Sequence, residues 1–528
     1  LAQAKDASRQ TPFLTVSRAV SQASDTDLIV INDGSYTTTE LGALSYVFVQ
    51  SKGLRFKAHR SGQVTFLGSV ATAVMRVNSM TAGLVITLDG IILNGASTSQ
   101  YCVLDDDASA SLHTITLTNC QTITPTLRGF SPACTKLILN LYNHTHSAVT
   151  RSMMFSNTLA SPSAVTVIGG STTLTGMNNT QGAIDITATN AGVSVTIVGH
   201  TLAATLDGSL TSTGTHYGII LQNITNVALS SNSVTVSGAP ASRLWGAIRV
   251  SASSAIAVTA PNITGNTVTN NGQGGYLILV GTDATGSGDG YVTDPVVNDN
   301  TITAVPANQT SVVHGILLGF NQGGQVLRNT VRGAGLALIQ KKNTVTGALF
   351  ADNTVRDCYS IVIYAKGALN TRFVNNSAYI TDTANGADAV TVLLALDDDV
   401  SGTHSTGIEF TNNAIHVQDN VLTKMVSVGT SNTATFANNL YYSVPALPAN
   451  PFTYQGVSYA SVALWAAAKE ATAVSGDPKF TDPANDNFRL QAGSACIGAG
   501  VTASGVTTDK AGVTFASPPS IGAYEYVA

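Results

Sequence analysis

An asparagine-centred motif returns along the chain at irregular intervals, and this repeat constrains the fold more than any other feature of the sequence. In each copy the asparagine is followed by Thr, Ser, Ala or Leu and usually by another apolar residue. The gaps between copies are 34, 34, 29, 24, 23, 37 and 26 residues. Helical repeats have nearly fixed lengths, so these gaps favour a solenoid of short strands in which one turn accepts insertions. The repeated residues are Asn232, Asn266, Asn300, Asn329, Asn353, Asn376, Asn413 and Asn439.

Short apolar runs lie between these asparagines, and they are too short for core helices. They suit strands buried on one face, because Gly, Asn, Asp and Ser in the intervening segments supply the conformations that tight turns need. One coil cannot bury its own apolar face, whereas stacked coils bury a continuous core with adjacent strands about 4.7–4.9 Å apart. The runs are 247–250, 276–280, 316–319, 336–339, 361–364 and 392–396.

Stacking also explains the asparagines themselves. A side-chain amide can donate to the coil on one side and accept from the coil on the other, so stacked asparagines form an internal ladder at a turn. We therefore interpret all of them as structural and none as catalytic.

The composition agrees with strands and turns. Charged residues make up only 10 % of the chain, against about 25 % in an ordinary globular protein, so the exposed faces of long helices lack their usual residues. A net charge of −5 gives no broad basic surface, and we expect no nucleic-acid binding. No apolar run is long enough to span a bilayer, so membrane insertion is not expected. The chain begins without a start methionine, and we expect a leader or N-terminal domain to be missing.

Both ends of the chain carry the features of a known architecture. The start, TPFLTVSRAVSQASDTDLIVINDGSYT (11–37), predicts a short amphipathic helix with Pro12, Leu14, Val16, Ala19 and Val20 on one face, followed by a strand and a turn. The end combines DPKFTDPANDNFRLQAGSACIGAG (477–500) with IGAYEY (521–526). Segment 459–472 shows helical periodicity and is expected to form part of the far cap.

With these repeats and ends, the chain resembles the right-handed parallel β-helix superfamily, which has the pectate-lyase-like fold. The resemblance implies an all-β solenoid with a short N-terminal capping helix and an irregular C-terminal cap. The expected parts are an N-terminal cap at residues 1–27, the β-helix at 28–440 and a C-terminal capping segment at 441–528. The closing motif is typical of secreted bacterial β-helix proteins, so the expected location is extracellular: secreted, on a cell surface or on a virion tail.

Polar residues follow several of the apolar runs at equivalent positions. Aligning the runs by eye places Asn321, Lys341, Lys366 and Asp397 on consecutive coils, after Ala252 and Gly281. This predicts a stripe about 15 Å long at the end of one sheet. Two adjacent lysines repel each other unless an anion binds or a carboxylate intervenes. The sequence therefore predicts a site for an acidic ligand.

In β-helix polysaccharide lyases a Lys or Arg takes the proton next to a uronate carboxylate, and cations held by acidic side chains neutralise that carboxylate. The resemblance implies the same chemistry here, with Lys341 or Lys366 as the base and Asp397 as its partner. A lysine serves as a base only if nearby positive charge or burial lowers its pKa from about 10.4. The plain alternative is that Lys341, Lys342 and Lys366 are solvated turn residues.

Two acidic runs, LDDDAS (104–109) and LDDDVS (396–401), offer oxygen ligands of the kind that Ca²⁺ prefers. We expect Asp397, Asp398 and Asp399 to be the calcium ligands if a cation binds, although aspartates are also common in turns. His314, Arg328, Arg356 and Arg372 lie in the same coils and are the expected substrate-binding residues.

A hydrolase that uses two carboxylates is the rival enzyme. It needs groups about 5–9.5 Å apart, and Asp397 with Asp399 or Glu409 is the candidate pair. The motifs of the polygalacturonases do not occur in the sequence, which argues against this option.

Three functions remain open at this point. The favoured one is a polysaccharide-binding and polysaccharide-degrading protein, a lyase on a uronate-containing glycan. The second is a phage tailspike or tail-fibre domain, which would be a homotrimer, whereas the other functions suit a monomer. The third is a non-enzymatic adhesin or structural solenoid.

Five cysteines, Cys102, Cys120, Cys134, Cys358 and Cys496, are too few and too scattered for a disulfide scaffold. We expect them to be small buried side chains, with Cys102 and Cys120 as the one pair that stacked coils could join.

Overall fold

A computed structural model describes most of the chain. The described residues are 2–4, 15–37, 47–50, 52–69, 71–78, 83–105, 111–132, 134–148, 153–177, 182–206, 215–238, 244–253, 255–272, 274–282, 289–305, 312–342, 346–381, 392–399, 401–418 and 424–528. Pro12 and Leu14 of the expected helical face, and the acidic residues Asp106 and Asp107, lie outside them.

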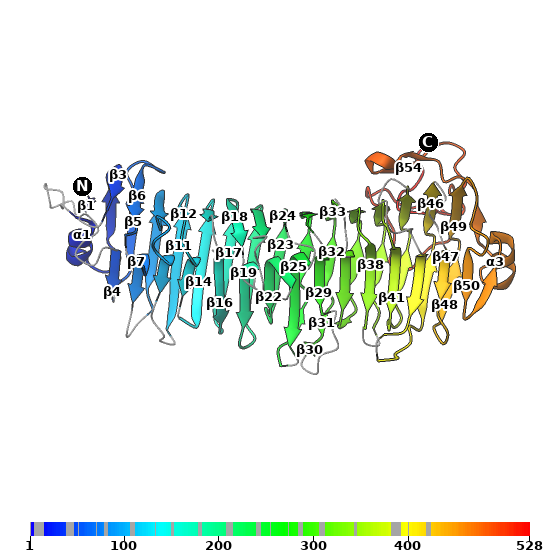
Figure 1. Cartoon of the computed structure of the whole chain (residues 1–528), viewed down its shortest axis with the longest axis horizontal. Coiled ribbons are helices and arrows are strands. Elements are labelled where there is room, and N and C mark those ends of the chain that lie inside the picture. The colour runs from blue at the N-terminus through cyan, green and yellow to red at the C-terminus, as the bar shows by residue number, and fades with distance from the viewer. Residues whose placement is uncertain are drawn as a thin grey trace. The chain divides into compact units, whose positions relative to one another are not determined.

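Strands form 56 % of the structure and helices 4 %, so the protein is all-β. It divides into two compact units, Leu1–Arg243 (unit 1) and Leu244–Ala528 (unit 2). In both units the chain runs through successive coils of three strands, and each strand pairs in parallel with its counterpart in the next coil (Figure 1). The predicted parallel β-helix is therefore confirmed. We name the three resulting sheets A, B and C.

Unit 1 opens with helix α1 (Val16–Gln22), whose N-cap Thr15 accepts a hydrogen bond from the backbone of Arg18 and whose residues Val16, Ala19 and Val20 are buried, as predicted. A short strand, β1 (Ala2–Ala4), pairs antiparallel with the first strand of sheet A. The strands of sheet A are β2 (Leu28–Ile31), β5 (Leu54–Ala58), β8 (Val85–Asp89), β11 (Leu112–Thr118), β14 (Lys136–Tyr142), β17 (Ser163–Ile168), β20 (Val193–Val198) and β23 (Asn226–Ser230). Sheet B has β3 (Gly34–Tyr36), β6 (Val64–Leu67), β9 (Ile91–Asn94), β12 (Gln121–Ile123), β15 (Thr145–Ala148), β18 (Ser171–Met177), β21 (Thr201–Leu206) and β24 (Ser233–Ser237). Sheet C has β4 (Val47–Gln50), β7 (Ala73–Asn78), β10 (Tyr101–Asp105), β13 (Arg128–Pro132), β16 (Met153–Leu159), β19 (Gly182–Ala188) and β22 (Thr215–Gln222).

Unit 2 repeats the three-strand coil. Its sheet A has β27 (Asn262–Thr264), β32 (Val296–Asn298), β36 (Gln325–Leu327), β39 (Leu349–Ala351), β42 (Arg372–Val374), β45 (Ile408–Thr411) and β48 (Ala434–Ala437). Sheet B has β28 (Thr267–Asn271), β33 (Thr301–Ala304), β37 (Thr330–Arg332), β40 (Thr354–Arg356), β43 (Ser377–Ile380), β46 (Ala414–Gln418), β49 (Leu440–Val444) and β52 (Val474–Ser475). Sheet C has β25 (Leu244–Ser253), β29 (Gly275–Gly281), β34 (Val313–Gly319), β38 (Leu336–Lys341), β41 (Ile361–Lys366), β44 (Val392–Asp397), β47 (Lys424–Val428) and β50 (Phe452–Tyr454).

A tight bend joins sheet A to sheet B in every coil of unit 2, and its interior holds the predicted asparagine ladder. At each bend one residue adopts a positive φ, for example Arg328 (57°) and Asp352 (56°). The next residue is a buried asparagine. From Asn300 to Asn439, the side-chain oxygen of this asparagine accepts from both the backbone and the amide nitrogen of the asparagine one coil earlier. The ladder comprises Asn266, Asn300, Asn329, Asn353, Asn376, Asn413 and Asn439.

The ladder ends on a buried carboxylate. One oxygen of Glu470 accepts from the backbone and side-chain nitrogens of Asn439, and the other accepts from Tyr441 and Trp465. Burial raises the pKa of Glu470. Trp465 lies on helix α3 (Val462–Ala468), which the periodicity of 459–472 predicted. It packs edge-on against Phe436 at the end of a row of rings that also includes Phe350, Phe373 and Phe410.

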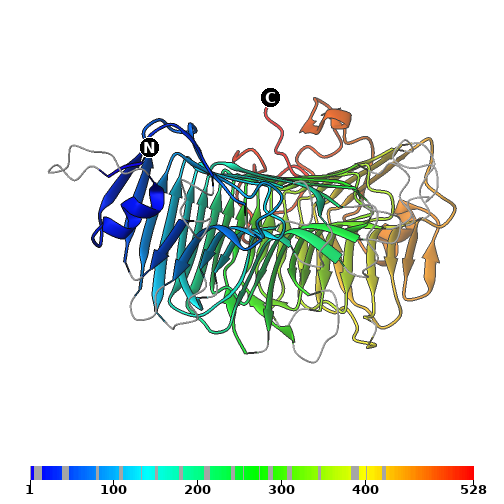
Figure 2. The same cartoon turned by 60° about the vertical axis from the view of Figure 1, so that its left-hand side comes forward.

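The last 50 residues or so of unit 2 are largely irregular, apart from the antiparallel pair β53 (Phe480–Asp482) and β54 (Asn487–Leu490). This C-terminal segment, defined here as residues 477–528, lies along the A-to-B bends (Figures 1 and 2). Its backbone contacts include Val501 with Asn412 and Ala523 with Ser377. The Lys510 ammonium donates to the carbonyl oxygens of Arg328 and Asn329.

Candidate functional site

Three of the predicted site residues lie side by side at the ends of neighbouring strands of sheet C. Lys341 of β38 pairs in register with Lys366 of β41, and Lys366 pairs with Asp397 of β44. We call Lys341, Lys366 and Asp397 the lysine row. The four residues before each of them are all buried. A slip of one residue would therefore place a charged side chain at a buried position.

The predicted places of Asn321 and Ala252 in this alignment are wrong. Gly319 is the residue in register with Lys341. Strand β34 begins at Val313, three residues before the apolar run at 316–319 that guided the alignment, and the chain then forms the separate short strand β35 (Asn321–Gln322). Ala252 pairs with Gly290 in an antiparallel extension of β25, strand β30 (Asp289–Gly290).

The lysine row is accessible. Lys341 and Lys366 are partly exposed, and Asp397 is exposed. The hydroxyl of Tyr364 donates to a carboxylate oxygen of Asp397 at 3.2 Å, and the backbone oxygen of Asp397 accepts from Ser405. These contacts fix the aspartate end of the row and leave its side chain at the surface.

The next lysine has a different role. Lys342 forms an ion pair with Asp399, with 2.7 Å between Nζ and Oδ2, and the two side chains are only 17 % and 4 % exposed. Burial of Asp399 opposes its ionisation. Hydrogen bonds from Lys342 and Ser401 outweigh burial, and they hold the pKa of this carboxyl well below its usual range. This pair therefore joins the ends of two strand-to-turn segments and is not available to a ligand.

The three consecutive aspartates face three different sets of partners. Asp397 bonds to Tyr364, and Asp399 bonds to Lys342 and Ser401. Asp398 accepts from Asn432 at 2.8 Å and pairs with His404 at 2.9 Å, and the hydrogen bond to His404 lowers the pKa of Asp398. Strand β44 ends at Asp397 and the chain then turns, which separates the carboxylates. The carboxylates of the three predicted calcium ligands are thus held by different partners and are not gathered around one point by their hydrogen bonds.

The predicted substrate-binding arginines lie at sheets A and B and have intramolecular partners. Arg328 forms two hydrogen bonds with Asp299. Arg372 forms two with Glu409 and donates to the backbone of Ser504. Glu409 is therefore held by an arginine on sheet A, whereas Asp397 ends a strand of sheet C.

Arg356 belongs to the attachment of the C-terminal segment. It pairs with Asp486 and donates to the carbonyl of Ala484, and Arg332 pairs with the same aspartate at 2.6 Å. Arg332 and Arg356 thus help to dock the chain's own C-terminal segment onto sheet B.

Two further predicted residues also have structural contacts. The ring of His314 stacks on Tyr276, with ring centroids 4.6 Å apart. Asn321 is fully buried, where its amide donates to the carbonyl of Gly323 and its oxygen accepts from Gln340. Asn321 therefore supports the turn after β34 from inside and does not face a ligand.

Sequence reasoning missed Tyr364 and the ion pair of Lys342 with Asp399. Tyr364 lies two residues before Lys366 on the same strand, a spacing that places both side chains on one side of a strand. That spacing was the available signal. For the ion pair of Lys342 the sequence offers no such signal, because the turn around Asp399 determines which carboxylate Lys342 contacts.

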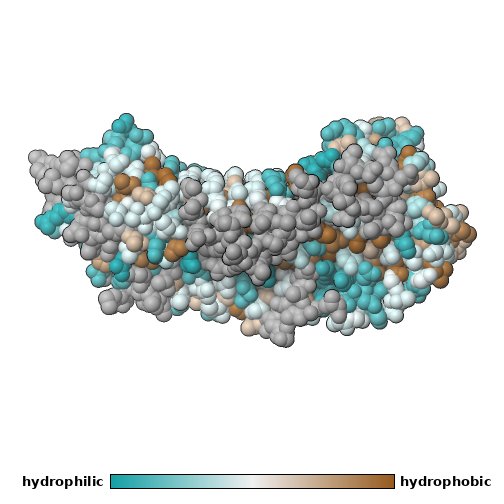
Figure 3. Space-filling view, viewed as in Figure 1, coloured by the Kyte–Doolittle hydropathy of each residue, from teal (hydrophilic) through white to brown (hydrophobic). Residues whose placement is uncertain are grey.

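All five cysteines are buried and none is in a disulfide, so Cys102 and Cys120 do not form the disulfide that was considered. Hydrophobic residues on the described surface in Figure 3 gather toward the end of unit 2 that carries α3, where Val457 and Leu464 are each 55 % exposed. Among the described residues, no helix is both long and apolar enough to cross a membrane.

No model of a known protein family matches the chain, and no curated protein matches it in sequence.

Proposed function

We propose that this protein acts outside the cell, where it binds an acidic polysaccharide along the lysine row and cleaves it by β-elimination. The observation that carries the proposal is the register of Lys341, Lys366 and Asp397 on adjacent strands. The resemblance to the pectate-lyase-like superfamily supports the choice of a uronate-containing glycan as substrate.

Charge favours an anionic ligand at this place. Paired parallel strands lie about 4.8 Å apart, so the two ammonium groups at the strand ends repel each other unless a negative charge lies between or above them. Asp397 supplies one negative charge at one end of the row, and Tyr364 holds it. A carboxylate of the glycan would supply another over Lys341 and Lys366.

The proposed reaction needs one proton acceptor. Lys366, in its neutral form, takes the proton from the sugar carbon next to the uronate carboxylate. The electron pair of that bond forms a double bond to the neighbouring carbon, whose bond to the glycosidic oxygen breaks. The departing oxygen takes a proton from solvent, and the new chain end is an unsaturated uronate. Lys341 neutralises the uronate carboxylate as negative charge develops beside it.

A panel of uronate-containing and neutral glycans tests this proposal. We expect binding to at least one uronate glycan and the ultraviolet absorbance of unsaturated ends during the incubation. New reducing ends without that absorbance would indicate that the protein is a hydrolase, as many tailspikes are, and not a lyase. Binding without any product would indicate a non-enzymatic adhesin in place of an enzyme. Absence of binding to every anionic glycan would overturn the proposal as a whole.

A further inference from the structure

The interior of unit 1 contains a cluster of three side chains that can ligate a metal. Asp105 is the last residue of β10, His113 is the second residue of β11, and Cys134 lies between β13 and β14. Asp105 is in register with Pro132, and His113 is in register with Leu137. Two neighbouring coils thus bring the three residues together where the chain passes from sheet C to sheet A.

The geometry of the cluster is compact. One ligand atom of each residue lies within 4.8 Å of the ligand atoms of the other two. Nδ1 of His113 and Oδ2 of Asp105 are 2.7 Å apart. The side chains are almost fully buried, with exposed fractions of 1 % for Asp105 and 0 % for His113 and Cys134. Among the described residues this is the one group of three His, Cys, Asp or Glu side chains that meets such a criterion.

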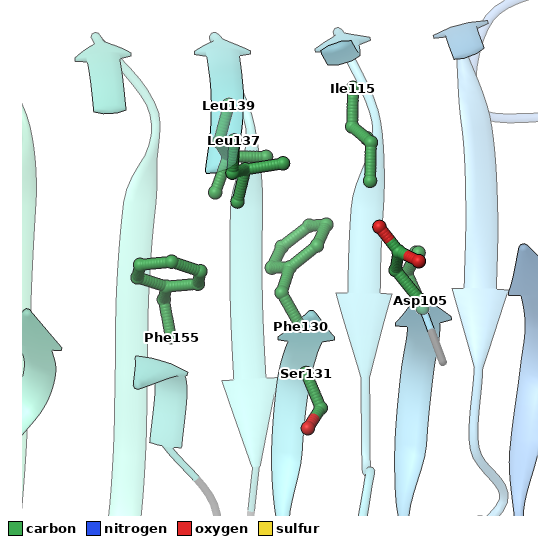
Figure 4. A pocket seen from close by; sticks show the side chains of 8 residues that line it. Asp105, Ile115, Phe130, Ser131, Leu137, Leu139 and Phe155 are labelled. Atoms are coloured by element: carbon green, nitrogen blue, oxygen red, sulfur yellow. The ribbon is translucent and has the colours of Figure 1, made fainter. Parts of the chain in front are cut away.

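The surroundings are apolar. A cavity of about 10 Å³ adjoins Asp105 (Figure 4), which is about the room that one water molecule needs. Ser131 is the other polar residue of its wall. The remaining wall consists of Val103, Ile115, Phe130, Leu137, Leu139 and Phe155. A charged carboxylate in such a place requires a compensating charge.

We propose that Asp105, His113 and Cys134 bind one divalent metal ion of the zinc class inside unit 1. A dication balances the charge of the buried cluster, because one carboxylate, one thiolate and one neutral imidazole together carry a charge of about −2. The donor set of sulfur, nitrogen and oxygen suits Zn²⁺ and Co²⁺, whereas Ca²⁺ and Mg²⁺ prefer oxygen ligands alone.

Three protein ligands leave one position of a tetrahedral ion open. Binding displaces the proton between His113 and Asp105 and the proton of the Cys134 thiol, because all three ligands coordinate in their deprotonated forms. The site lies among the hydrophobic side chains of two coils, so its role is to stabilise unit 1.

Metal content of the full chain tests the site directly. We expect about one zinc ion per chain after expression in zinc-supplemented medium and desalting. Expression in cobalt-supplemented medium is expected to give thiolate-to-cobalt charge-transfer absorption. Cys134→Ser removes the thiolate with little change in volume, and it is expected to abolish that absorption and to lower the metal content at least tenfold.

Cys120→Ser is the matched control, because Cys120 is equally buried in the neighbouring A-to-B bend and has no part in the cluster. It is expected to retain metal and absorption. Should Cys134→Ser fail to fold, the thiolate-to-cobalt absorption of the folded, unsubstituted chain and its retention in Cys120→Ser decide the matter. The proposal is overturned if the folded chain carries less than about a tenth of one ion, or if Cys134→Ser retains its metal. In that case Asp105 and His113 form only an ion pair.

Discussion

Units 1 and 2 build the same bend between sheets A and B but fill its interior with different side chains. In unit 2 the position after the positive-φ residue is an asparagine in coil after coil. In unit 1 each of these bends also has a residue of positive φ, for example Asn119 at 51°. The positions that follow hold Cys120, His144, Gly170, His200 and Asn232. The backbone contacts between coils are alike, as in Thr145 to Cys120 and Thr330 to Asn300.

The side-chain networks differ in whether they can titrate. In unit 1 the hydroxyl of Thr122 bonds to His144 and His146, and the hydroxyl of Thr172 bonds to His200. Asn232, which the repeat groups with the ladder, accepts from the backbone of His200 and donates to the carbonyl of Ile197. The ladder asparagines make the same two backbone contacts, as Asn329 does with Asn300 and Val297. The backbone therefore sets the bend, and the side chains set how it responds to pH.

The largest effect is expected from removing one rung of the ladder in unit 2. Asn353 accepts from the backbone and amide nitrogens of Asn329 and donates to Val326 and Asn376. Asn353→Ala leaves several buried groups without partners, each at a cost of about 1–3 kcal/mol, so we expect a loss of about 5 kcal/mol in the free energy of unfolding. Urea unfolding of the full chain measures it.

The exposed Asn485 offers the matched control, and Asn485→Ala is expected to change stability by less than about 0.5 kcal/mol. A similarly small loss for Asn353→Ala would mean that the ladder is not what holds the bends of unit 2.

The second prediction concerns how the stability of the two kinds of bend depends on pH. Burial, with the nearby charges of other histidines, lowers the pKa of His144 and His146 to about 3 from an ordinary value of 6.5. Between these values the unfolded chain binds more protons than the folded one, so stability falls as the pH falls. From about pH 7 to about pH 5 we expect each histidine to cost about 2 kcal/mol.

Hydrogen exchange of the full chain at both pH values localises this loss. Peptides around Thr122, His144 and His146 are expected to lose protection in acid, whereas peptides of the asparagine ladder keep theirs. The double variant His144→Gln, His146→Gln should remove most of the difference between the two pH values. The exposed His59, replaced by Gln, should not. If the ladder peptides lost as much protection in acid as the histidine peptides, the predicted difference between the two units in their response to pH would be wrong.

A smaller effect concerns the C-terminal segment along the bends of unit 2. Lys510→Ala removes two hydrogen bonds to the carbonyls of Arg328 and Asn329, and we expect a loss of about 2 kcal/mol in the stability of this segment. Hydrogen exchange within residues 477–528 measures it. Lys479, which is exposed in the same segment, provides the control. Unchanged protection in Lys510→Ala would show that the segment is held by its other contacts.

The sequence was sufficient to predict the features that follow from a repeat. The ladder depends on the asparagine that recurs at each bend, and the register of Lys341, Lys366 and Asp397 depends on the short apolar runs before them. Both features are visible in the sequence. Contacts between residues far apart in the sequence could not be predicted from the repeat. The partners of Arg356 and Arg372 in the C-terminal segment lie 128 and 132 residues away, and no local sequence pattern indicates these contacts. The aspartates after β44 were grouped because they are adjacent, although a turn separates their carboxylates.

The proposed function rests on the lysine row, and a pair of single substitutions tests it most directly. Lys366 lies in the row, whereas Lys424 begins strand β47 of the same sheet at the opposite strand end, in register with Val392. On a uronate glycan that the unsubstituted protein cleaves, we predict that Lys366→Ala lowers the rate of unsaturated product at least a hundredfold, as expected for loss of a general base, while Lys424→Ala keeps it. Equal rates in the two variants would contradict the assignment of the site.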